Sequence, residues 1–158
     1  MNLKGIILWV SLLPVGFVFS QVESMSVGKE KFLNPTINSV SYLMNNIDSV
    51  IYNQVLLPLG LISLPSSQKV NALEYKKSKN GITQYIGFDD RFGVLTVTWK
   101  DESGKNFMSS VLKKSLKGKE HTVPGCYKTM VNTQNIIICI ESKKDKTINE
   151  MITVEFER

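Results

Sequence analysis

Histidine and cysteine are scarce in this chain, which has one histidine and two cysteines among 158 residues. A structural zinc site needs four nitrogen or sulfur ligands, and a catalytic site needs three with a water molecule. His121, Cys126 and Cys139 could supply three ligands at best, so the sequence favours no metal ion or other cofactor. The cysteines also lack Cys-x-x-Cys spacing, which argues against a thiol redox activity.

Motifs that mark nucleophilic catalysis or phosphate binding are absent as well. Ser109 and Ser110 are not set in a Gly-x-Ser-x-Gly elbow, and no glycine-rich phosphate motif occurs. His121 lies in a polar connection, where a solvated histidine is the default. We therefore predict that the protein is not an enzyme. The alternative is a hydrolase that uses His121 or two carboxylates, since any two acids could meet in the folded chain.

The charge of the chain is modest, with 19 basic residues, 14 acidic residues and a net charge of +5. A nucleic-acid-binding protein usually concentrates its basic residues on one face. Here the lysines form short groups around residues 76–79, 113–119 and 143–146. This pattern indicates solvated turns and helix ends, with an anion-binding patch as the alternative. We expect no nucleic-acid partner.

The first twenty residues have the three parts of an export signal. Lys4 provides the positive start, residues 5–19 form an apolar run, and Ser20 offers a small residue for cleavage. The run is shorter than the roughly twenty residues that span a bilayer. The Phe-Ser-Gln ending resembles bacterial export signals, and no nearby cysteine could carry a lipid anchor. We predict a cleaved signal peptide (1–20) and a periplasmic or extracellular protein without a stable membrane anchor.

We assign the remaining 138 residues (158 − 20) to a flexible lead-in (21–33) and one domain (34–158). Helical periodicity appears at the start of this domain. Asn34 and Pro35 predict a helix start. Apolar residues at spacings of three and four extend this helix to about Gln54. They are Ile37, Val40, Met44, Ile47 and Ile51. A second helix is predicted over 106–117, where a strand is the alternative, and Gly118 suits a left-handed residue after it.

Apolar and polar residues alternate with a period of two in much of the rest of the chain, which indicates strands. The Asn80-Gly81 pair predicts a hairpin turn between the first two strands. Strand candidates begin at about Asn71 and continue at 82–88, 92–99, 126–130, 136–142 and 148–156. We therefore predict an α+β fold, with an antiparallel sheet of five or six strands and two helices on one face.

The order of one helix followed by three strands occurs twice, in residues 34–100 and 101–158. Residues 74–76 match 126–128 at an offset of 52 (126 − 74), and residues 94–99 match 151–156 at an offset of 57 (151 − 94). A tandem α-β-β-β duplication explains both matches. The alternative is that antiparallel hairpins share alternating threonine, valine and aromatic residues. In architecture the layout resembles PepSY-type and β-lactamase-inhibitor-like domains, which are exported and bind other proteins, although no motif of either family is present.

The two cysteines are candidates for a disulfide. A hairpin centred between Asn132 and Thr133 would place Cys126 opposite Cys139, with Cα atoms about 4.4 to 6.8 Å apart. An oxidising compartment would preserve the bond. The alternative is two free thiols, with Cys139 buried among isoleucines.

The predicted sheet leaves one face without helices. Its residues would include Thr96, Thr98, Thr153 and Glu155. We predict that this polar face binds a protein partner, as inhibitor and immunity proteins do. The alternative is a carrier of a small apolar ligand, with the apolar stretch at residues 55–64 lining its cavity.

Overall fold

The computed structural model describes residues 22–65 and 72–157, so the predicted signal peptide (1–20) lies outside the described residues. The fold is α+β, as predicted. Within these residues one antiparallel sheet has the strand order β3 (Ile62–Ser63), β4 (Ala72–Lys79), β5 (Ile82–Asp89), β6 (Val94–Asp101), β9 (Ile148–Phe156), β8 (Gln134–Lys144) and β7 (Cys126–Val131). The other elements are the hairpin of β1 (Ser24–Val27) and β2 (Glu30–Leu33), helices α1 (Ile37–Asn45), α2 (Ser49–Leu56) and α3 (Ser110–Ser115), and the 3-10 turn η1 (Leu57–Leu59).

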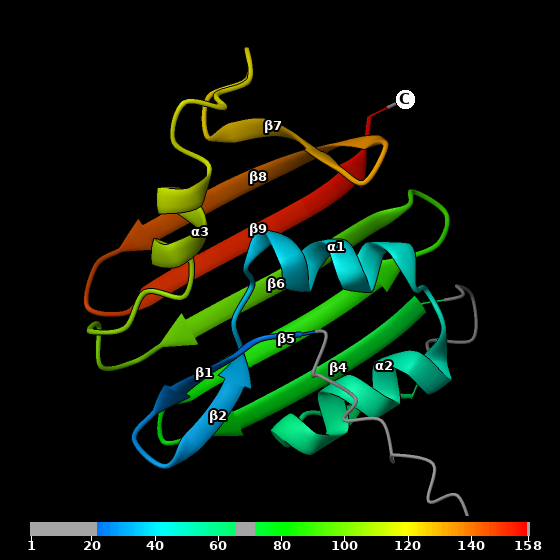
Figure 1. Ribbon diagram of the computed structural model, residues 1–158. Helices are drawn as coiled ribbons and strands as arrows, with labels where there is room; N and C mark the ends of the chain where they lie inside the picture. The colour runs from blue at the N-terminus through cyan, green and yellow to red at the C-terminus, as the bar shows by residue number, and fades with distance from the viewer. Residues whose placement is uncertain (1–21, 66–71, 158) are drawn as a thin grey trace, which may run out of the picture.

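The helices and the small hairpin all lie in front of the large sheet, as Figure 1 shows. Side chains alternate between the two faces of a strand, and every second residue of the central strands is buried beneath these elements. The aromatic centre of this core is Trp99, whose ring meets Phe32 edge-on at 5.1 Å. Both rings are at most 1% exposed. The core therefore lies between the sheet and its single layer of helices.

The sheet consists of two three-stranded meanders, β4–β5–β6 and β7–β8–β9, joined through β6 and β9. Both begin with a tight hairpin. Asn80 and Gly81 have φ of 54° and 74°, and Asn132 has φ of 56°, the left-handed values that asparagine and glycine accept most readily. The hairpin turn expected at Asn80-Gly81 is therefore confirmed.

The long helix expected from Pro35 to Gln54 is wrong, because the chain breaks between α1 and α2. The Asp48 carboxylate accepts hydrogen bonds from the backbone N–H groups of Val50 and Ile51, and so caps a new helix. Thr36, rather than Asn34, caps α1. Ile47 of the expected apolar stripe consequently lies at the surface, where it is 43% exposed, and Val50 in the first turn of α2 is 59% exposed.

The expected flexible lead-in is also wrong, since residues 24–33 form the β1–β2 hairpin. Phe32 and Leu33 are fully buried. The amide of Gln84 accepts from Leu33 N and donates to Leu33 O, both at 2.9 Å, much as a neighbouring strand would. The Lys77 ammonium donates to Lys31 O at 2.8 Å and forms an ion pair with Glu30 at 2.9 Å. Two polar side chains of the sheet thus hold this hairpin.

The second helix is confirmed, although α3 is shorter than the expected 106–117. Its preceding loop is held by Glu150 of β9, whose carboxylate accepts from the backbone N–H groups of Met108 and Ser109 and from the Ser109 hydroxyl. Gly118 has φ of 81°, as expected for the residue after the helix. The strand alternative for this segment is wrong.

Candidate functional site

The candidate site is the face of the large sheet that points away from the helices, which we call the open face. On β6 the residues Leu95, Val97 and Trp99 face the core, so their neighbours face outward. Thr96, Thr98 and Thr153 are half-buried there, and Glu155 is exposed. Thr96 lies directly opposite Thr153 where the two meanders meet. The four predicted partner-face residues therefore share one surface, although their role in binding stays a prediction.

A hollow of about 370 Å³ lies on one side of these threonines, and we call it the Glu74 hollow. Its floor is Gly87, where an added Cβ atom would come within 2.8 Å of the Tyr85 ring. Burial, together with a hydrogen bond to Glu74 and the charge of that carboxylate, raises the pKa of Tyr85 to about 12. The residues that line the Glu74 hollow are Ala72, Glu74, Tyr85, Gly87, Phe88, Asp89, Phe92, Val94 and Thr96.

A second hollow of about 340 Å³ lies toward the other end of the open face, and we call it the Lys100 hollow. It includes Thr98 and carries mixed charge, from Lys100, Lys143 and Glu141 among others. Thr96 thus lines one hollow and Thr98 lines the other.

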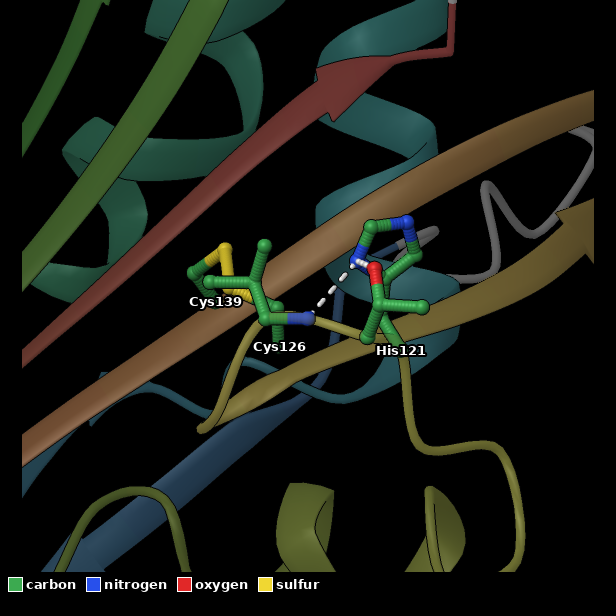
Figure 2. Close-up of a disulfide and its surroundings, with 5 residues drawn as sticks. His121, Cys126 and Cys139 are labelled. Carbon is green, nitrogen blue, oxygen red and sulfur yellow. Dashed lines mark hydrogen bonds between the residues drawn. A yellow bond between two sulfur atoms is a disulfide. The ribbon is translucent and has the colours of Figure 1, made fainter.

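The predicted disulfide is present, and Figure 2 shows it beside His121. Cys126 pairs with Cys139, in the predicted register, and Cys139 in turn lies opposite Thr153 on the open face. The two Cα atoms are 4.0 Å apart, closer than the expected 4.4 Å or more. The reason is that Cys126 directs its backbone N–H to Val123 and its carbonyl to His121, away from Cys139. Such non-hydrogen-bonded pairs lie closest in antiparallel sheets. The free-thiol alternative is therefore wrong.

His121 closes its own turn. Its Nδ1 lies 3.3 Å from Val123 N and 3.4 Å from the Thr122 hydroxyl (Figure 2). The Ser109 hydroxyl donates to Glu150, and the Ser110 hydroxyl donates to Phe107 O. These contacts give the hydrolase hypothesis no support.

The carrier hypothesis gains no support from four hollows on the surface of the described residues. The apolar stretch at 55–64 lines neither open-face hollow, nor either of two further hollows beside α1 and α2. Among the described residues, no group of three or more His, Cys, Asp or Glu is placed to hold a metal ion. No helix within the described ranges is both long and apolar enough to cross a membrane.

Sequence reasoning missed the Glu74 hollow. Its components form no motif, because a glutamate, a tyrosine and a glycine on two strands suggest no chemistry together. The available signal was Gly87 inside an apolar strand, where an isolated glycine often marks a close approach by another group.

Comparisons with known proteins identify no relative of this chain. No family model, no curated protein and no solved structure matches it.

Proposed function

We propose that the protein is an exported, non-enzymatic binding protein whose open face docks a protein partner, in the manner of an inhibitor or immunity protein. The observation that carries this proposal is that, among the described residues, the helices and the β1–β2 hairpin all lie on one side of the sheet (Figure 1). The central strands β6 and β9 consequently present their outer side chains to the surroundings.

The chemistry of this face suits a protein partner. Threonine hydroxyls both donate and accept hydrogen bonds, and Thr96, Thr98 and Thr153 sit on two rigid paired strands. The flanking hollows offer places for anchoring side chains, which dominate the binding energy of most interfaces. A standard interface buries about 800 Å² on each partner, which sets the area that the partner should cover on this face.

Two features support export. The segment 1–20 has the pattern of a signal peptide, and the chain carries a disulfide, a bond that persists in oxidising compartments.

The test is site-specific photo-crosslinking in the cells that make the protein. A photoreactive phenylalanine analogue replaces Thr98 or Thr153 on the open face, and Lys114 on the exposed side of α3 serves as the matched control. We expect both open-face positions to yield an adduct with the same protein, and the control position to yield none. A Thr96→Arg substitution should abolish that adduct by blocking the face. Equal adducts from all three positions, or none from the open face, would refute the proposal.

A further inference from the structure

We propose that the Glu74 hollow is a specificity pocket for a lysine or arginine side chain of the partner. This inference rests on the proposed docking at the open face, and it names the chemistry that the partner must present there.

The charge of the lining selects a cation. The lining contains two carboxylates, Glu74 and Asp89, and no basic residue. Asp89 already forms an ion pair with Arg91 at 2.9 Å. Among the described residues, no lysine or arginine forms an ion pair with Glu74. Its negative charge is therefore available to an incoming cation.

The aromatic groups of the hollow suit the same ligand. The ring faces of tyrosine and phenylalanine attract cations through their quadrupoles, more strongly where water is partly excluded. Phe92 already shows this behaviour, since the Arg91 guanidinium lies 5.2 Å from its ring centroid. Tyr85 brings a second ring next to Glu74. A lysine or arginine side chain would lay its aliphatic stem against these rings and direct its charged end to the carboxylate.

All the residues that line the Glu74 hollow belong to the first meander, β4–β5–β6. Glu74 lies opposite Gly87, six residues before Asn80 of the hairpin turn (80 − 74). Cys126 lies opposite Cys139, also six residues before the turn residue Asn132 (132 − 126). The second meander thus holds a covalent bridge at the position where the first holds an acid opposite a glycine that the Tyr85 ring covers. Sheet geometry therefore does not by itself produce the hollow, since the residues at these positions decide it.

The Lys100 hollow provides a comparison on the same face. The charged side chains that line it on the open face are Lys100, Lys143 and Glu141, so it carries both signs of charge. Its Glu141 is an exposed open-face acid outside the Glu74 hollow, and it supplies the matched control substitution.

The test is a titration of the isotopically labelled protein with N-acetyl-arginine amide, followed by amide chemical shifts. We expect the shifts to concentrate at Gly87, Thr96 and Phe92, with a Kd on the order of 5 mM, as suits one side chain. Glu74→Gln should weaken this binding by about tenfold, whereas Glu141→Gln should change it less than about twofold. N-acetyl-glutamine amide, a neutral probe, should shift none of the three amides.

A second variant probes the shape of the hollow. Gly87 has no positive φ, so Gly87→Ala keeps the backbone while its methyl group displaces the Tyr85 ring, and binding of the probe should fall by at least about fivefold. Shifts spread over surface acids, or equal losses in the two glutamine variants, would overturn the proposal. That result would leave the crosslinking test untouched, because docking at Thr98 needs no cation in the Glu74 hollow. Crosslinking that fails while the titration succeeds would instead refute the proposed docking, and with it the partner as the source of the cation, while the cation specificity of the hollow would stand.

Discussion

Removal of the Cys126–Cys139 bond should destabilise the protein by an amount that the structure lets us calculate. The cysteines are 13 positions apart, so the closed loop contains 14 residues (13 + 1). The chain-entropy relation then gives about 3 kcal/mol at 25 °C. This value is an upper limit, because a hairpin with a tight turn at Asn132 keeps its strands near one another even in the unfolded chain. We expect a Cys126→Ala/Cys139→Ala variant to lose about 2 to 3 kcal/mol.

Thermal unfolding, followed by circular dichroism, measures this loss. For the 138 residues expected after cleavage (158 − 20), an unfolding entropy of about 2.1 cal/mol/K per residue converts it to a fall in Tm of about 7 to 10 °C. The control is the wild-type protein in reductant, which should melt close to the variant, whereas reductant should leave the variant itself unchanged. A fall of less than about 2 °C would refute the entropic argument. Mass spectrometry of the unreduced protein, which should lack about two hydrogens, would show whether the bond had formed.

Three buried polar groups give further predictions. Glu150→Gln should lower the free energy of unfolding by about 2 to 4 kcal/mol, measured in urea, because the Met108 and Ser109 N–H groups lose a charged acceptor. Amide hydrogen exchange in residues 108–115 should become faster, and unchanged exchange there would contradict the prediction. Lys77→Met should lower the free energy of unfolding by about 1 to 3 kcal/mol and expose the β1–β2 hairpin to proteolysis, since two backbone carbonyls lose their donor. The control Lys79→Met, at an exposed position, should change neither the stability nor the proteolysis. Burial would raise the pKa of Asp101, but hydrogen bonds from Ser103 and Asn106 outweigh it and lower the pKa from 3.8 to about 2. Its contribution of about 2 kcal/mol is present above pH 4 and lost as the pH falls through about 2, so Asp101→Asn should flatten the acid limb of the stability curve.

The strands were predictable because their signals are local. Alternation over eight residues fixes which side chains share a face, and Asn-Gly at positions 80–81 fixes the first turn. In the second meander the hypothesis of a Cys126–Cys139 pair required a hairpin centred between Asn132 and Thr133, and the structure has that register. The break between α1 and α2 could not, because the apolar spacing continues through it. A single aspartate that caps in one context is solvated in another, so Asp48 did not reveal its role.

The remaining errors share one physical cause, which is that distant polar side chains order the segments concerned. Gln84 is 51 positions from Leu33, and Glu150 is 42 positions from Met108. Each occupies a position where alternation expects an apolar residue, and each supplies hydrogen bonds to backbone that lies outside any long ladder. The β1–β2 hairpin and the loop before α3 therefore gain their order from residues that no local window contains. The Glu74 hollow was missed for the same reason, because Glu74 and Gly87 come together only when β4 pairs with β5.

The threonines also explain why one face of the sheet stays open. Either face of β6 could in principle accept a helix, and the choice follows from the energy of burial. Leu95, Val97 and Trp99 gain free energy when covered, at roughly 25 cal/mol per Å² of apolar area. The hydroxyls of Thr96 and Thr98 would lose their water beneath a helix whose own backbone groups are already bonded, and an unsatisfied buried hydroxyl costs about 1 to 3 kcal/mol. A partner that supplies polar groups of its own can cover them without that cost. The pattern that directs the helices to one face is therefore the same pattern on which the proposed docking of a polar protein surface rests.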